Sequence, residues 1–311
     1  MLLVVSPNLA VDRILEVDGF RPAAVQRCRA VRSQPGGKGS NVARVFRQLG
    51  GEVVLVGFVG KRNAGWVVDP LQAIGVTVDA VEGYSAECRT CTVILDVSSN
   101  GHPTVINEES PAIESGAESA LLATIERRLD RATALLVAGS LSRGLTADFY
   151  KRVLGMAASL PCLTAIDATG EALRAGLQAQ PAIVKANADE MNAGFGDLGL
   201  DPHQIASSMK ARRSELPPHA VVTLGSSGAL YMNDGALAYA MPPRISTGNP
   251  IGAGDSFAAG FIKALLDQKA PNDALRFATA VAVSDVFTPE PGTIVSDEIG
   301  ELYKQTSVER W

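Results

Sequence analysis

Short runs of consecutive apolar residues alternate with longer amphipathic stretches along most of the chain. An apolar run bounded by turn residues is typical of a buried strand, and apolar residues at helical spacing are typical of a surface helix. Because the two alternate, we expect a mostly parallel sheet with helices on its faces. The predicted strands are residues 2–5, 53–56, 135–137, 163–166, 183–184 and 221–224, followed by a β-meander over 229–240. The predicted helices are residues 40–49, 66–74, 113–130, 146–158, a short one before 183, 202–213, 255–267, 272–286 and one from 297.

Two regions do not fit this alternation. Residues 25–33 alternate loosely between apolar and polar side chains, and residues 89–97 and 103–107 are rich in β-forming residues. Asn100 and Gly101 predict a hairpin turn between the last two. We therefore predict one domain over residues 1–311, with a small sheet, a candidate lid, inserted at about residues 9–34 and 88–108.

The composition is that of a globular protein. Of 311 residues, 46% are hydrophobic and 20% charged, and no apolar run approaches the ~18 residues that span a bilayer. The net charge of −5 argues against nucleic acid or an anionic membrane as the main partner. Four cysteines do not form a disulfide framework in a chain of this length, and Cys88 and Cys91 fit ordinary strand cysteines better than a zinc or redox site. Since no basic leader precedes the first predicted strand, we expect a cytoplasmic protein.

One basic segment departs from the acidic balance of the whole chain. Between Gly19 and Gly51 there is no Asp or Glu. Such a segment favours the binding of a small anionic ligand. The alternative is a solvated face whose charges are balanced from elsewhere, which is the commoner reason for any single arginine. The basic residues of this segment are Arg21, Arg27, Arg29, Arg32, Lys38, Arg44 and Arg47.

A glycine-rich turn runs into a predicted helix at residues 249–262. The amides of Gly252, Ala253 and Gly254 are expected to have no partner within the helix and to lie at the positive end of its dipole. Such amides favour an anion such as a phosphate, and Asp255 in the same turn could accept a proton. The alternative is that Asp255 only caps the helix. The turn fits neither a Walker loop nor a dinucleotide-binding fingerprint.

A second glycine-rich turn, at residues 36–39, opens another predicted helix and brings Lys38 and Asn41 to its start. Polar and glycine residues also follow several predicted strands, at positions 139–144, 167, 185–187 and 225–228. In an open α/β sheet, ligands bind at the edge where the parallel strands end. We therefore expect a ligand site at this edge.

Together the two turns resemble the two sequence signatures of the ribokinase-like, or PfkB-type, carbohydrate kinases. The first corresponds to residues 36–43, with Gly50 and Gly60 at their spacings, and the second to residues 249–262. The pair is far more specific than either turn alone, and the resemblance covers essentially the whole chain. It implies a ribokinase-like three-layer α/β/α sandwich, with a mostly parallel central sheet and a small inserted β-sheet lid. It also implies a kinase that uses ATP and Mg²⁺.

The resemblance implies a role for each matching residue. Asp255 would be the general base that takes the proton of the sugar hydroxyl, and the amides of Gly252, Ala253 and Gly254 would stabilise the transferring phosphoryl group. Asn187 and Glu190 would help to hold Mg²⁺ and its waters. The residues implied to contact ATP are Lys185, Asn187, Thr223, Gly225, Ser226 and Gly228, and those implied to hold the sugar hydroxyls are Asp12, Gly37 and Asn41.

Within the family, the chain looks like the kinases of phosphorylated sugars. Residues 6–12 resemble the N-terminal strand of 1-phosphofructokinases and tagatose-6-phosphate kinases, and the basic segment supports a substrate that already carries phosphate. Residues 89–95 and 104–108 look closer to the tagatose-6-phosphate branch, and residues 36–44 to the fructose-1-phosphate kinases. Fructose 1-phosphate, fructose 6-phosphate and tagatose 6-phosphate therefore all stay open as substrates. The residues that match positions at or beside the substrate's phosphate are Arg27, Lys38, Arg89 and Ser140.

Several positions depart from the family pattern. Ser142 and Arg143 replace two prolines, Ala186 replaces the proline before the metal-site motif, and Ser284 and Asp285 replace small residues that line the adenine pocket. The alternatives to a phosphosugar kinase are a kinase of an unphosphorylated sugar or nucleoside, and a non-catalytic sensor of sugar phosphates or nucleotides. The exposed edge of the predicted lid also leads us to expect a homodimer through the lid.

Overall fold

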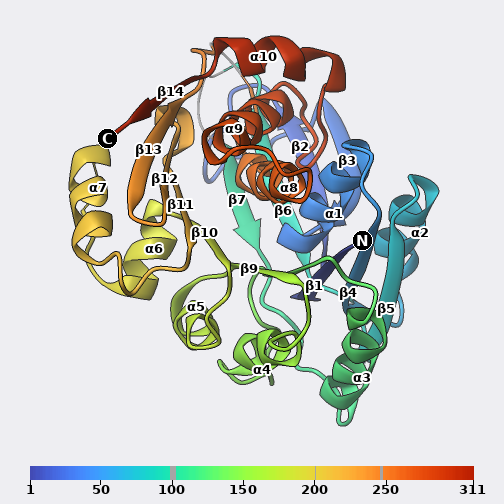
Figure 1. Ribbon diagram of the computed structural model, residues 1–311. Coiled ribbons are helices and arrows are strands. Elements are labelled where there is room, and N and C mark those ends of the chain that lie inside the picture. The colour runs from blue at the N-terminus through green and yellow to red at the C-terminus, as the bar shows by residue number, and fades with distance from the viewer. Residues whose placement is uncertain (99–102, 200, 246–247) are drawn as a thin grey trace.

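A large twisted sheet crosses the molecule, with helices on both of its faces and a smaller sheet beside it (Figure 1). The computed structural model describes residues 1–98, 103–199, 201–245 and 248–311. In these residues the large sheet has the strand order β14-β13-β12-β11-β10-β9-β8-β1-β4-β5, and the small sheet has the order β3-β2-β6-β7. The predicted fold class, an α/β sandwich with a second small sheet, is confirmed.

The large sheet is parallel from β5 to β11 and antiparallel from β11 to β14. Its central strands contain apolar runs, since helices cover both faces of the sheet. All residues of β1, β4 and β8 are buried. Strand β1 lies between β4 and β8, so the strand order changes direction there. The strands are β1 (Leu2–Asn8), β4 (Val53–Gly60), β5 (Thr77–Tyr84), β8 (Ala134–Ala138), β9 (Leu163–Asp167), β10 (Ile183–Asn187), β11 (His219–Thr223), β12 (Ala229–Asn233), β13 (Ala236–Met241) and β14 (Ser307–Arg310).

The small sheet consists of β2 (Ala10–Val17), β3 (Ala30–Gly36), β6 (Thr90–Asp96) and β7 (Thr104–Asn107). Strand β2 pairs antiparallel with β3 and parallel with β6, which pairs antiparallel with β7. The predicted turn at Asn100 and Gly101 lies outside the described residues. Its four strands lie in the two sequence regions that do not follow the alternation of strand and helix.

Two groups of helices cover the large sheet. Helix α8 packs against both α1 and α9, and α10 packs against α9 (Figure 1). Helices α3, α4, α5 and α6 form a second chain of contacts. The helices are α1 (Lys38–Gln48), α2 (Gly65–Ala73), α3 (Ala117–Leu129), α4 (Phe149–Met156), α5 (Gly170–Leu177), α6 (Ala188–Phe195), α7 (Pro202–Ala211), α8 (Ala253–Leu266), α9 (Pro271–Val286) and α10 (Ile299–Gln305), with 3-10 turns η1 (Gly225–Ser227) and η2 (Ser296–Glu298). None of the described helices is long and apolar enough to cross a membrane.

Two local predictions need correction, and two elements were missed. The strand expected from residue 25 begins only at Ala30, where its pairing with β2 ends opposite Glu16, and most of residues 21–29 are exposed. The turn at residues 36–39 is shorter than expected, since β3 runs to Gly36 and α1 begins at Lys38. Helix α6 and strand β14 were not predicted; α6 is a short helix that follows β10 directly, and β14 is a mostly exposed edge strand without an apolar face.

Candidate active site

The predicted site residues gather where the parallel strands of the large sheet end. Asp167, Asn187 and Thr223 are the last residues of β9, β10 and β11, and Ser140 follows β8 closely. The first turns of α1 and α8 meet at this edge, because a side chain of α1 contacts one of α8 there. This is the edge at which open α/β sheets bind ligands, beside the point where the strand order reverses.

Both α1 and α8 begin after a glycine with a positive φ angle. Gly37 has φ 88° and Gly252 has φ 86°, and neither helix has a side-chain cap. The alternative that Asp255 merely caps α8 is therefore wrong; Asp255 lies inside the first turn. One of the three amides predicted to be unpartnered has a weak partner, because Ala253 N lies 3.3 Å from Pro250 O across the turn.

Asp255 is buried and directly hydrogen-bonded to the other glycine-led helix. Its Oδ2 accepts from Asn41 Nδ2 at 2.8 Å. Burial, and then the charge of Asp167, raise the pKa of Asp255 to about 6, although Lys185, Lys38 and the Asn41 hydrogen bond lower it. A carboxylate with this pKa is ionised at neutral pH and is more basic than an ordinary aspartate, so it suits proton transfer.

Asp167 is a central residue of the site to which the sequence analysis gave no role. Its side chain is fully buried between two lysines, with Lys38 Nζ 2.6 Å from Oδ1 and Lys185 Nζ 2.8 Å from Oδ2. Burial would raise the pKa of Asp167, but the two ammonium groups outweigh it and hold the pKa low. The signal that could have found it is an acidic residue at the carboxyl end of a buried strand.

The two lysines place positive charge beside the turn that begins α8. A methyl group on Gly254 would lie 3.0 Å from Lys185 Nζ, so that ammonium group packs under the turn. Lys38 Nζ also contacts Glu190 Oε1 at 2.6 Å. Burial would lower the pKa of Lys38, but Asp167, Glu190 and Asp255 together raise it. Lys38, which was predicted near the substrate's phosphate, therefore lies among the residues predicted for the nucleotide and metal.

Asn187 and Glu190 form the cap of α6. Asn187 Oδ1 accepts from Glu190 N at 2.8 Å, and Glu190 Oε2 accepts from Asn187 N at 2.9 Å. Both Glu190 oxygens thus have protein partners. In the described residues, no group of three His, Cys, Asp or Glu is suited to direct metal binding. The amide and carboxylate oxygens fit Mg²⁺ held through its waters, which this ion gives up reluctantly.

Asp12 is the buried acid on the small-sheet side of the site. A methyl group on Gly36 would lie 2.0 Å from Asp12 Oδ1, so only glycine fits opposite this carboxylate. Burial raises the pKa of Asp12 to about 6, against the opposing charges of Arg44 and Arg89. Arg44 in turn donates to Asn41 Oδ1 at 3.3 Å, which links the small-sheet side to the partner of Asp255.

Several other predicted site residues are exposed. Arg27 is exposed on the segment between β2 and β3, and Ser140 is exposed and accepts from Asn8 Nδ2 at 2.9 Å. Gly225 and Ser226 form the exposed turn η1 after β11. Gly228, which directly follows η1, must be glycine, because a methyl group there would lie 1.9 Å from Ala240 O.

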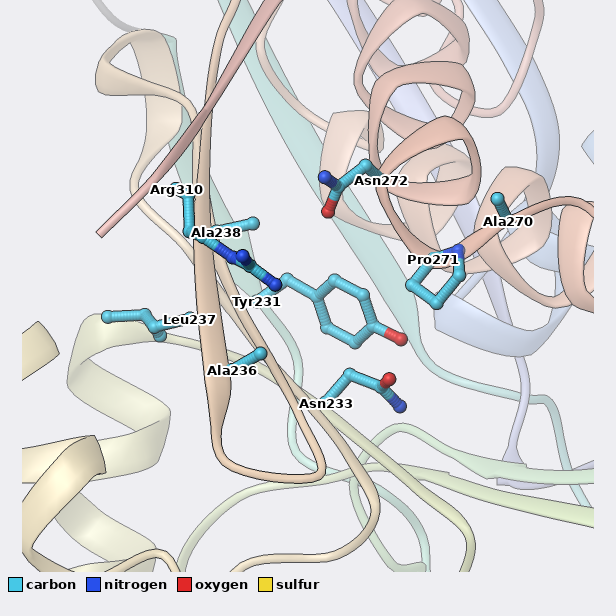
Figure 2. A pocket seen from close by; sticks show the side chains of 9 residues that line it. All are labelled: Tyr231, Asn233, Ala236, Leu237, Ala238, Ala270, Pro271, Asn272 and Arg310. Atoms are coloured by element: carbon cyan, nitrogen blue, oxygen red, sulfur yellow. The ribbon is translucent and has the colours of Figure 1, made fainter.

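A separate pocket of about 270 Å³ lies between β12, β13 and the start of α9 (Figure 2). None of the site residues predicted from the sequence lines this pocket. In Figure 2 the ring of Tyr231 points into the space between Asn233 and Pro271. The lining residues are Tyr231, Asn233, Ala236, Leu237, Ala238, Ala270, Pro271, Asn272 and Arg310.

Comparison with known families decides what kind of protein carries this site. The profile of the pfkB family carbohydrate kinases matches residues 1–297. The chain belongs to the PfkB family of carbohydrate kinases. The predicted enzyme class, a phosphotransferase with an alcohol acceptor, is therefore confirmed.

Relatives of this PfkB kinase match over nearly their whole length. A tagatose-6-phosphate kinase from Staphylococcus epidermidis is 26% identical over 317 residues, which cover 99% of each chain. Phosphofructokinase-2 from Escherichia coli, in complex with substrates and products, superimposes with a TM-score of 0.87 at 23% identity, over 97% of this chain and 98% of that one. A protein described as a possible 1-phosphofructokinase from Thermotoga maritima has a TM-score of 0.87 at 21% identity, over 100% and 99% of the two chains.

Proposed function

We propose that this PfkB kinase transfers the γ-phosphoryl group of ATP to a hydroxyl of a ketohexose phosphate, with Asp255 as the general base. The observation that carries the proposal is the position of Asp255. It is a buried carboxylate with a pKa raised to about 6, in the first turn of α8, hydrogen-bonded to Asn41 and close to two lysines. A proton acceptor beside an anion-binding turn is the arrangement that phosphoryl transfer to an alcohol requires.

In the proposed reaction, Asp255 takes the proton of the substrate hydroxyl. The hydroxyl oxygen forms a bond to the γ-phosphorus as the bond from that phosphorus to the bridging oxygen of ADP breaks, and ADP leaves with the bridging oxygen. Negative charge on the transferring group is stabilised by the amides of Gly252, Ala253 and Gly254 and by Lys185, which packs under the same turn.

ATP and Mg²⁺ are the proposed nucleotide and metal ion. Lys185, Thr223, the exposed Gly225 and Ser226 of η1, and Gly228 directly after η1 are proposed to contact the phosphates of ATP. Asn187 and Glu190 are proposed to hold the waters of Mg²⁺, as their paired oxygens allow. When bound, the ion supplies positive charge that neutralises the phosphates during transfer.

The proposal of a phosphorylated substrate rests on the basic segment and on the names of the relatives. Asp12, Gly37 and Asn41 are proposed to hold the sugar hydroxyls, and Arg27, Lys38, Arg89 and Ser140 to lie at or beside the substrate's phosphate. Arg89 lies near Asp12, which gives the sugar side a positive charge. Fructose 1-phosphate, fructose 6-phosphate and tagatose 6-phosphate remain the candidate substrates.

We also propose a homodimer through the small sheet. This sheet and its connections expose several large apolar side chains, which a second copy would cover. Ile106→Lys in β7 should then convert a dimer to a monomer in sedimentation, whereas the control Ile74→Lys, directly after α2, should not. A dimer that survives Ile106→Lys would contradict this assembly. The exposed apolar residues of the small sheet and its connections are Val25, Val31, Val97, Val105 and Ile106.

The four cysteines, Cys28, Cys88, Cys91 and Cys162, are all free. Unpaired thiols are typical of proteins in reducing compartments. We therefore keep the cytoplasm as the proposed location.

A substrate panel tests the proposed function. ATP turnover with Mg²⁺ is measured in parallel with fructose 1-phosphate, fructose 6-phosphate, tagatose 6-phosphate, ribose and adenosine. A strong preference for one of the phosphosugars supports the proposal. A preference for ribose or adenosine would favour a kinase of unphosphorylated substrates, and no turnover in a protein that binds ATP would favour a sensor.

A further inference from the structure

A second buried aspartate lies against the turn that begins α8. Asp285, near the end of α9, is 1% exposed, and the proposed reaction does not use it. A buried carboxylate is costly unless its oxygens have hydrogen-bond partners. Its partners therefore indicate what it does.

Asp285 joins α8 to the loop that follows α9. Its Oδ2 accepts from Ser256 Oγ at 2.9 Å, and its Oδ1 accepts from Thr293 N at 2.9 Å. Ser256 directly follows Asp255, and its amide donates to Gly252 O at 2.8 Å. One carboxylate thus holds the first turn of α8 to the loop at residues 288–294.

The turn packs closely against this carboxylate and loop. A methyl group on Gly252 would lie 3.0 Å from Asp285 Oδ2 and 2.8 Å from Gly292 N. No side chain separates Gly252 from Asp285. A shift of Asp285 would therefore move the backbone whose amides are proposed to bind the phosphoryl group.

The other side of the same loop is fixed to α1. A methyl group on Gly292 would lie 2.8 Å from Asn41 Cα, and Gln48 Nε2 donates to Gly292 O at 3.1 Å. Ile294 N donates to Gln48 Oε1 at 3.0 Å. The loop is therefore held between Asn41, which contacts the proposed base, and Asp285, which contacts the anion-binding turn.

A negative charge on Asp285 would not help the proposed site to bind an anion. Burial raises the pKa of Asp285 to about 7, against the hydrogen bonds from Ser256 and Thr293; Asp255 of α8 raises it further, and Arg44 of α1 lowers it. A negative charge this close to the turn would oppose binding of an anionic phosphoryl group. The useful property of the side chain is its pair of hydrogen-bonding atoms, which an asparagine also has.

We propose that Asp285 is a positioning residue for phosphoryl transfer, which holds the Gly252 turn and Asp255 in register with Asn41 through Ser256 and the 288–294 loop. This inference rests on the proposed kinase function. It assigns to Asp285 no contact with substrate or nucleotide, and predicts an effect on the transfer step rather than on binding.

Three variants test the proposal. Asp285→Ala removes both hydrogen bonds, and Asp285→Asn keeps both, since the asparagine oxygen accepts from Thr293 N and its amide donates to the Ser256 hydroxyl. Thr279→Ala is the control, because it removes a different buried hydrogen bond of α9, from Thr279 Oγ1 to Leu275 O at 2.9 Å. Each is assayed for kcat, for KM of ATP and of the preferred sugar phosphate, and for thermal unfolding.

We expect Asp285→Ala to lower kcat by roughly 10- to 100-fold with little change in either KM. Asp285→Asn and Thr279→Ala should keep kcat within about threefold of wild type. A kcat of Asp285→Ala equal to that of Thr279→Ala would overturn the proposal. So would an equal loss in Asp285→Ala and Asp285→Asn, which would show that the charge matters.

If Asp285→Ala does not fold, Ser256→Ala removes the same hydrogen bond from the other end. A loss of kcat in Ser256→Ala with unchanged KM values supports the proposal, and wild-type kcat overturns it. Failure of the proposed function is a different result. In that case the wild-type protein itself transfers no phosphoryl group to any of the tested acceptors.

Discussion

Asn41 Nδ2 lies 2.8 Å from Asp255 Oδ2, and this hydrogen bond joins two glycine-led helices whose first turns are 214 residues apart in the chain. The amide stabilises the ionised carboxylate and therefore lowers the pKa of Asp255, against the effects of burial and of Asp167. In the proposed mechanism, it also aims the base at the site of transfer. The two signatures in the sequence are thus parts of one site.

Asn41→Ala should shift the titration of Asp255 to higher pH. Without the Asn41 hydrogen bond, the pKa of Asp255 rises above about 6, so the fall of kcat toward acidic pH should begin at higher pH than in wild type. The pH profile of kcat measures this shift. Asn233→Ala, which removes a side chain on β12 that is bonded to Pro218 O, is the control. An unshifted profile for Asn41→Ala would remove Asn41 from this role.

Asp255→Asn should abolish most of the activity while stabilising the fold. As a general base, Asp255 should contribute roughly 100-fold or more to kcat, with the affinities for ATP and sugar retained. A near-wild-type kcat would exclude that role.

The stability effect of Asp255→Asn has a definite sign. The folded-state pKa of about 6 is above the ordinary value of 3.8, so ionising Asp255 costs folding free energy as the pH rises through this window. The variant should therefore unfold at a higher temperature than wild type at pH 8, and the difference should shrink at pH 4. A lower melting temperature than wild type at pH 8 would contradict this account of the carboxylate.

Asp167 should be the main stabilising acid of the site. Asp167→Ala leaves Lys38 and Lys185 without their shared carboxylate, and breaking such a buried pair costs about 3–5 kcal/mol. Because the pKa of Asp167 is held low, its stabilising contribution is present above the ordinary aspartate range and is lost as the pH falls below it. Urea unfolding at pH 7 and at acidic pH measures both effects. Equal stability of wild type and Asp167→Ala at pH 7 would refute this role.

Arg27→Ala should weaken binding of the substrate's phosphate and leave the stability of the fold unchanged. Arg27 is exposed, so its removal should leave the melting temperature unchanged. We expect KM for a phosphosugar to rise much more than KM for an unphosphorylated analogue. Arg21→Ala, in the same exposed segment, is the matched control. Equal effects of Arg27→Ala on both substrates would place Arg27 outside the phosphate site.

The sequence pattern predicts the large sheet because its central strands contain runs of apolar residues, as at the start of β1 and of β4. It fails at elements that lack such a pattern. Strand β14 has one half-buried residue, Val308, and is defined by pairing with β13 rather than by an apolar face. The start of β3 is likewise set by its partner β2. Pairing between distant segments is invisible to a local pattern.

The same distinction applies to the site. Asp255 and Asn41 could be singled out because each stands beside a glycine-rich turn. The roles of Asp167 and Asp285 depend on partners far away in the chain, such as Lys38 at 129 residues from Asp167 and Ser256 at 29 residues from Asp285. Asp167 stands at the end of a buried strand, but the partners of both acids can be identified only in the folded arrangement.

The most direct test of the proposed reaction is ³¹P NMR of a mixture of ATP, Mg²⁺ and the preferred ketohexose phosphate with wild type and with Asp255→Asn. We expect wild type to convert ATP to ADP while a second phosphomonoester resonance grows on the sugar in equal amount. Asp255→Asn should form this product at a rate lower by roughly 100-fold or more. Loss of ATP without a sugar bisphosphate, or equal rates for the two proteins, would contradict transfer by this site.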